Sequence, residues 1–129
     1  WNALMLKAYV DAYTVFDEQH FLDVAIKNAN FILQKQLRSD GGLNHNYKDG
    51  TSTINGFLED YCFTIEALIA LYEATCIEQY LHKANELMSY CIIHFEDKNT
   101  GMFYFTSDED KALISRKMEL SDNVIPASN

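Results

Sequence analysis

The sequence has a single proline, three cysteines and only ten basic residues among its 129 positions. A chain with so little proline, 48% apolar residues and 13% aromatics is not disordered and has the size of an ordinary soluble domain. The ten basic residues stand against 19 acidic ones, which gives a formal net charge of −9. Because this charge repels phosphate backbones and anionic lipids, we expect neither nucleic acid nor a membrane surface as a partner.

Long apolar runs and export signals are also missing. No run reaches the roughly 18 to 20 apolar residues that a bilayer-spanning helix needs, and no basic segment leads into an apolar segment with a cleavage site. The cysteines, at positions 62, 76 and 91, form no Cys-x-x-Cys pair and lie within or beside segments of helical periodicity. We therefore interpret them as buried free thiols and expect a cytoplasmic protein.

What the sequence does contain is an internal repeat. At a shift of 59 residues the chain matches itself, so that Tyr13, Leu22, Ala25 and Gly42 align with Tyr72, Leu81, Ala84 and Gly101. Tetratricopeptide and ankyrin units are excluded, because their periods are roughly 33 to 34 residues. The repeat predicts a unit of two long helices followed by a loop that turns at glycine.

Helical periodicity predicts two hairpins of helices within one partial domain. The predicted parts are hairpin one at 1–38, a loop at 39–55, hairpin two at 56–96, and a β-containing loop with the start of a further hairpin at 97–129. The first helix of each hairpin is apolar on most sides, and the second carries one apolar stripe. The first helices are therefore predicted to be inner and the second helices outer.

Inner apolar helices surrounded by outer amphipathic ones are the layout of an α/α toroid. The predicted fold class is all-α, an arc of about two hairpins from such a toroid, with short β excursions in the loops. A closed ring of roughly six such units would need about 350 residues. We therefore expect a fragment, and we expect it to be unstable or to self-associate, because its open edges would expose apolar faces of the inner helices.

Four segments resemble the family of thioredoxin-domain-containing proteins that includes spermatogenesis-associated protein 20. They are Trp1–Met5, Gly56–Phe63, Leu71–Ala74 and Asp122–Asn129, of which Gly56–Phe63 is the most specific. The resemblance covers the whole chain, although Ala3 departs from the usual Trp-Asn-Gly. It implies a six-hairpin α/α barrel similar to N-acylglucosamine 2-epimerases and six-hairpin glycosidases, preceded by a thioredoxin-like domain that these residues do not include.

Two acids, Glu59 and Asp60, stand in the first turn of the second inner helix, near the central cavity of such a barrel. Carboxylates there could bind sugar hydroxyls or transfer protons. Alternatively, they only interact with the helix dipole, which is worth about 0.3 to 1 kcal/mol. Neighbouring helix positions point about 100° apart, so the two acids cannot act together on one substrate atom. A catalytic partner would come from another hairpin.

The loop before that helix carries His45 and Tyr47. An unperturbed imidazole titrates near pH 6.5 and suits proton transfer, and the resemblance implies histidine chemistry of the epimerase kind. The alternative is a solvated or turn-bonding histidine. No two histidines have the spacing of metal ligands. We predict no metal and no cofactor.

The remaining candidates would form the walls of a sugar site. Trp1, Phe57 and Tyr61 could stack on a sugar ring, although aromatic residues at helical spacing also serve as core. Asp122 and Asn123 match the family segment at the start of the next inner helix. The predicted catalytic residues are Glu59, Asp60, His45 and Asp122, and the predicted substrate-binding residues are Trp1, Asn2, Tyr47, Phe57, Tyr61 and Asn123.

Two functions follow from this interpretation. One is an enzyme that acts on a carbohydrate by isomerisation, epimerisation or glycosidic cleavage. The other is a non-catalytic helical scaffold that binds a protein partner or supports the thioredoxin-like domain. A cavity lined by the candidate polar groups would favour the enzyme, and their dispersal in solvent would favour the scaffold.

Overall fold

The computed structural model describes residues 1–110, 114–122 and 124–129. Its helices are α1 (Asn2–Phe16), α2 (Gln19–Phe31), the π-helical turn η1 (Ile32–Gln36), α3 (Leu58–Thr75) and α4 (Glu78–His94). The predicted all-α class is confirmed, and β structure in the described residues is limited to isolated bridges. Among these helices, none combines the length and the apolar character that a membrane crossing requires.

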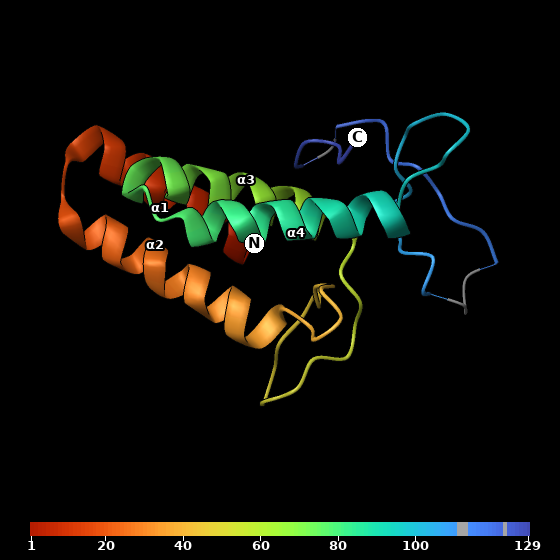
Figure 1. The fold of residues 1–129 in the computed structure, drawn as a ribbon, viewed down its shortest axis with the longest axis horizontal. Helices are drawn as coiled ribbons and strands as arrows, with labels where there is room; N and C mark the ends of the chain where they lie inside the picture. The colour runs from red at the N-terminus through yellow and green to blue at the C-terminus, as the bar shows by residue number, and fades with distance from the viewer. Residues whose placement is uncertain (111–113, 123) are drawn as a thin grey trace.

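The helices form two antiparallel hairpins that lie side by side (Figure 1). Helix α1 packs on α2, α3 packs on α4, and α1 and α3 pack on each other. The arrangement is therefore the predicted one, with α1 and α3 as the inner pair. Both tight turns lie toward the left of Figure 1 and both long loops toward the right, where α1 and α3 begin.

The turns inside the two hairpins are copies of each other. Asp17 ends α1 and Cys76 ends α3, both with a left-handed backbone, at φ 54° and 55°. Each donates its backbone N–H to the carbonyl four residues earlier, on Tyr13 and Tyr72. The repeat seen in the sequence thus holds through the helices. Cys76, which we predicted to be buried, is exposed because it occupies this turn.

In the loops the repeat slips by one residue. Leu37 pairs with Leu43, whereas Glu96, 59 positions after Leu37, pairs with Phe103, 60 positions after Leu43. The second loop therefore contains one extra residue. Gly101 (φ 72°) accordingly takes the place of Gly41 (φ 90°), and not of Gly42 as the ungapped alignment predicted.

Parts of the predicted apolar stripes face solvent. Helix α4 buries Tyr80 and Leu87, whereas Leu81 and Met88 of the same helix are exposed. Helix α3, predicted to be an inner helix that is apolar on most sides, exposes Ile69. Within the described residues, no element packs against this side of hairpin two. The sequence pattern identified apolar positions correctly but not which of them the chain itself covers.

Tyr61 on α3 connects the first loop to both helices of hairpin two. Its side chain is 1% exposed, and its hydroxyl oxygen accepts the backbone N–H of Leu43 at 2.8 Å. The ring stacks on Tyr90 at 5.4 Å and meets the edge of Phe95 at 5.1 Å. Burial raises the pKa of Tyr61 to about 12, so the phenol stays neutral at physiological pH.

Gly56 lets the loop approach α3 closely. Its N–H donates to the Leu43 carbonyl at 2.8 Å, and a Cβ placed on it would lie 2.8 Å from that oxygen. Any side chain here would push the loop away from the helix. Leu43, and with it the following residues of the loop, is thereby fixed at the start of α3.

We expect Tyr61→Phe to lower the free energy of unfolding by about 1 to 3 kcal/mol, because it leaves the buried Leu43 N–H without an acceptor. Urea denaturation followed by circular dichroism measures the change. Tyr72→Phe is the matched control, since the half-buried Tyr72 makes no side-chain hydrogen bond with a described residue. Equal effects of the two substitutions would show that the Leu43 hydrogen bond does not fix the loop.

Candidate functional site

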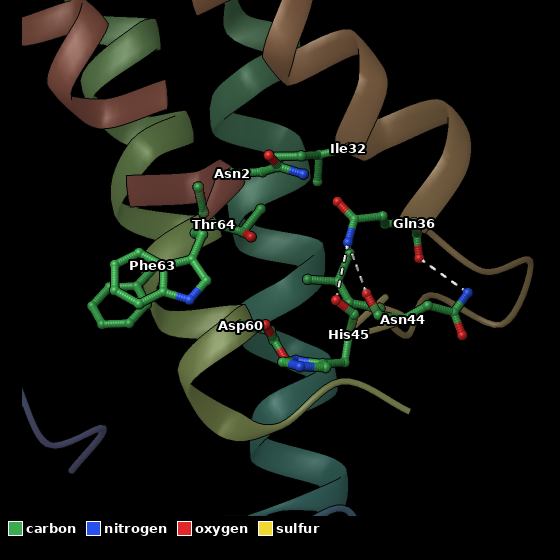
Figure 2. Close-up of a pocket in the computed structure, with 11 residues that line it drawn as sticks. Asn2, Ile32, Gln36, Asn44, His45, Asp60, Phe63 and Thr64 are labelled. Carbon is green, nitrogen blue, oxygen red and sulfur yellow. Dashed lines mark hydrogen bonds and ion pairs between the residues drawn. The ribbon is translucent and has the colours of Figure 1, made fainter. Parts of the chain in front are cut away.

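A cavity of about 220 Å³ lies where α1 and α3 begin, beside the first loop (Figure 2). Four elements contribute its lining: α1 with its N-cap, η1, the loop and the first turns of α3. The lining residues are Trp1, Asn2, Ala3, Ile32, Gln36, Leu43, Asn44, His45, Asp60, Phe63 and Thr64. Two predicted catalytic residues and two predicted substrate-binding residues are among them.

His45 and Asp60 form a hydrogen-bonded pair in the wall of this cavity. His45 Nδ1 lies 2.9 Å from Asp60 Oδ2, and the same oxygen accepts the backbone N–H of Phe57 at 2.8 Å. Phe57 is the N-cap of α3, so Asp60 supplies the acidic half of a capping box. The carboxylate therefore closes the start of the helix and holds the histidine with one oxygen.

The hydrogen bond also sets the tautomer of His45. An ionised carboxylate only accepts hydrogen bonds, so Nδ1 carries a proton, and in the neutral ring Nε2 then keeps its lone pair. Within the described residues, no group hydrogen-bonds to Nε2. The ring rests on Phe57 at 4.9 Å, and Phe57 stacks on Phe105 at 4.9 Å. His45 thus presents a positioned, unoccupied acceptor.

Two neutral amide side chains, those of Gln36 and Asn44, line the cavity next to His45. The Asn44 N–H donates to the Gln36 carbonyl at 2.8 Å, and Gln36 Nε2 donates to the Asn44 carbonyl at 3.2 Å. Gln36 lies in the π-helical turn η1, which closes with the Leu37 N–H on the Ile32 carbonyl at 3.0 Å. Turns of this kind occur frequently at functional sites.

The charge of the lining suits an uncharged polar ligand. His45 and Asp60 are its titratable side chains, and it includes no lysine or arginine side chain. Asn2, Gln36 and Asn44 add amide groups that can both donate and accept hydrogen bonds. An anionic ligand would find no lysine or arginine side chain of the lining to pair with.

The other predicted acids lie away from this lining. Glu59 is half-buried, and burial raises its pKa, with smaller contributions from the neighbouring Asp60 and Glu119. Asp122 is exposed, and its carboxylate accepts the Ala127 N–H at 2.9 Å, which closes a turn. Asn123 lies outside the described residues.

The aromatic residues that we predicted to bind the substrate do not all line the cavity. Trp1 lines the cavity, whereas Phe57 lies behind His45 and Tyr61 lies in the core. Tyr47 contacts Phe31 edge-to-face at 5.5 Å and is not part of the lining. The cavity therefore brings together Trp1, Asn2, His45 and Asp60 from the predicted set.

Sequence reasoning missed seven lining residues: Ala3, Ile32, Gln36, Leu43, Asn44, Phe63 and Thr64. Phe63 and Thr64 follow Asp60 by three and four positions, so they lie on the same face of α3 and helical spacing alone could have found them. Gln36 points to the site because of the π-helical turn, for which we identified no signal in the sequence.

We expect Glu59→Gln to raise the free energy of unfolding at pH 7. A raised native pKa means that the folded chain binds the proton more tightly than the unfolded chain, so this group destabilises the fold as the pH rises through and above its ordinary value of 4.5. The gain should shrink as the pH falls below that value. Thermal unfolding from pH 3 to pH 8 measures it.

Glu78→Gln is the control for this experiment, because Glu78 stands exposed in the first turn of α4. Its loss removes a favourable helix-dipole interaction and should give no gain at pH 7. A lower stability of Glu59→Gln at neutral pH would contradict the unfavourable environment of Glu59.

The chain is similar to known proteins both in sequence and in fold. No family model matches the chain. Over 99% of its own length, the chain is 33% identical to the uncharacterized protein B0495.5 of Caenorhabditis elegans. It is 27% identical to human spermatogenesis-associated protein 20 over all of its length. It spans 18% of the length of each of these relatives.

Two solved structures share the architecture. Cellobiose 2-epimerase from Spirochaeta thermophila superposes with a TM-score of 0.77 and 18% identity, covering 95% of this chain and 31% of that one. Cellobiose 2-epimerase from Bacillus thermoamylovorans superposes with a TM-score of 0.71 and 14% identity. The match covers 91% of this chain and 34% of the epimerase chain. The predicted fold is confirmed: the chain is an arc of an epimerase-like, six-hairpin α/α toroid.

Proposed function

We propose that the cavity binds a sugar and that His45, oriented by Asp60, transfers a proton to and from it, as in an epimerase or isomerase. The observation that carries the proposal is the His45–Asp60 hydrogen bond of 2.9 Å in the wall of a cavity otherwise lined by neutral groups. The toroid fold and the names of the two solved structures support a carbohydrate ligand.

The geometry favours proton transfer over glycosidic cleavage. Glycosidases use two carboxyl groups about 5 to 9.5 Å apart on either side of the bond. Here one carboxylate, Asp60, lines the cavity, and one of its oxygens already accepts two hydrogen bonds. Nε2 of His45 can instead remove a proton from a sugar carbon next to a carbonyl group, whose oxygen then takes up the negative charge.

Epimerisation also requires return of the proton to the opposite face of that carbon. A second acid must therefore face His45 across the substrate, and the other hairpins of a closed toroid are the place for it. The cavity of these two hairpins is smaller than the roughly 300 to 1,000 Å³ of common ligand sites. It accordingly accommodates one part of the ligand, with Trp1 and Phe63 available to stack on a sugar ring.

As the resemblance implies, the whole protein would combine this domain with a thioredoxin-like domain in the cytoplasm, where the free thiols Cys62, Cys76 and Cys91 stay reduced. The second candidate function is a non-catalytic scaffold. It is favoured by the observation that Asp60 already serves a structural purpose as the cap of α3.

We expect at least one sugar from a panel of monosaccharides and disaccharides to raise the melting temperature, since a ligand at 100 times its Kd adds about 2.7 kcal/mol. His45→Ala should abolish the shift or reduce it strongly. His82→Ala, which changes an exposed histidine on α4, should retain it.

Proton transfer has its own readout. In deuterium oxide, the stabilising sugar should gain one deuterium at the reacting carbon with the wild-type protein and none with His45→Ala. Binding without deuterium uptake would contradict the catalytic assignment of His45. If no sugar binds, the scaffold function holds instead.

A further inference from the structure

One nearly buried hydroxyl in the cavity lining has no hydrogen-bond partner among the described residues. It belongs to Thr64 of α3, which is 3% exposed and follows Asp60 by one helical turn. Buried hydroxyls in folded proteins ordinarily have a partner, so each exception calls for an explanation. Thr64 lies in the joint between α1 and α3, both of which the chain contains, and therefore does not belong to an open edge of the arc.

Other hydroxyls on the helices of this chain are satisfied within their own helix. Thr14, Thr75 and Ser89 each donate to the backbone carbonyl four residues earlier, at 3.0, 2.6 and 2.9 Å. This is the usual hydrogen bond of a threonine or serine inside a helix. Thr64 makes no such bond to the Asp60 carbonyl. Its hydroxyl is therefore available to a group that enters the cavity.

The hydroxyl oxygen of Thr64 can also be reached from the cavity. Within the described part of the chain, three hydroxyls are completely buried and without a partner, those of Ser52, Thr106 and Ser128. Thr64 is not among them, although its side chain is buried and makes no hydrogen bond. The small surface that Thr64 keeps thus includes its oxygen, and this surface borders the cavity.

Gln36 brings an unused acceptor to the same cavity. Its Nε2 donates to the carbonyl oxygens of Asn44 and His45, at 3.2 and 3.4 Å. Because a carbonyl oxygen only accepts hydrogen bonds, the amide nitrogen must face these two groups and Oε1 must face away from them. Figure 2 shows this oxygen on the side of Asn2. Among the residues that the structure describes, none donates a hydrogen bond to it.

We propose that Thr64 and Gln36 form a subsite for one hydroxyl group of the sugar. The ligand hydroxyl donates to Oε1 of Gln36, and the Thr64 hydroxyl donates to the ligand oxygen. A carboxylate or phosphate group would set a negative oxygen against the acceptor of Gln36, and an ether oxygen would leave that acceptor unpaired. The subsite therefore selects a neutral hydroxyl. This inference rests on the proposed function, since it specifies the ligand of the same cavity.

The subsite lies beyond the groups that we propose for proton transfer. Thr64 follows Asp60 by four residues, about 6 Å along the axis of α3, and Asp60 holds His45 at 2.9 Å. The hydroxyl that Thr64 binds is therefore not on the reacting carbon but further along the sugar. Thr64 thus acts as a specificity-determining residue, because a site built to hydrogen-bond a hydroxyl rejects the analogue that lacks it.

The test is calorimetric titration of the full-length protein with the sugar that raises its melting temperature and with the deoxy analogues of that sugar, one for each hydroxyl position. One analogue should bind about a hundredfold more weakly than the parent sugar, because it loses two hydrogen bonds worth about tenfold each. Thr64→Val keeps the shape of the side chain and removes its hydroxyl. It should weaken binding of the parent about tenfold and reduce the discrimination against that analogue from about a hundredfold to about tenfold.

Thr14→Val is the matched control. It makes the same change on the other inner helix, at a hydroxyl that is bonded to the Val10 carbonyl and lies outside the cavity lining, so the wild-type discrimination should be retained. Gln36 is less suitable for substitution, because its Nε2 also holds the carbonyl of His45.

An unchanged discrimination in Thr64→Val would overturn the subsite and leave sugar binding beside His45 intact. Without sugar, Thr64→Val should melt at the temperature of the wild type, whereas Thr75→Val should melt lower, since it loses its bond to Leu71. Equal losses in both variants would show that another part of the polypeptide satisfies the Thr64 hydroxyl, which would also overturn the inference. If no sugar binds the wild type, the proposed function fails and the subsite fails with it.

Discussion

The candidate site depends on one carboxylate oxygen. Oδ2 of Asp60 accepts the N-cap N–H of α3 and the Nδ1 proton of His45. The first hydrogen bond fixes where the helix begins, and the second fixes how the histidine from the preceding loop is oriented. Because the two share an atom, the start of the inner helix and the geometry of the potential base cannot vary independently. The helix-capping and catalytic interpretations of Asp60 are therefore compatible.

A second constraint brings the loop within reach of this carboxylate. Tyr61 follows Asp60 directly and holds the backbone of Leu43, while Gly56 permits contact with the Leu43 carbonyl. Leu43 lies two residues before His45. The hydrogen bond of the buried tyrosine to Leu43 therefore also restricts the position of His45. The same short segments, the loop and the first turn of α3, thus form both the contact between the loop and the helix and the wall of the site.

Most of the fold could be predicted from the sequence, because the repeat of 59 residues and the helical periodicity record the packing of each hairpin. The exposed side of each hairpin could not, since Leu81 and Met88 look like core residues wherever a neighbour is expected. Of the predicted site residues, His45, Asp60, Trp1 and Asn2 line one cavity. Tyr61 was assigned to the site because periodicity does not tell whether a ring points into a cavity or into the core. Gln36 could not be predicted, since its position follows from a π-helical turn.

The most direct measurement is nitrogen NMR of the His45 imidazole in the protein labelled with nitrogen-15. The account predicts the neutral Nδ1–H tautomer, with Nε2 unprotonated, and its loss in Asp60→Asn. An Nε2–H tautomer, or a ring that averages freely between the two forms in the wild-type protein, would contradict the claim that Asp60 orients His45 as a base.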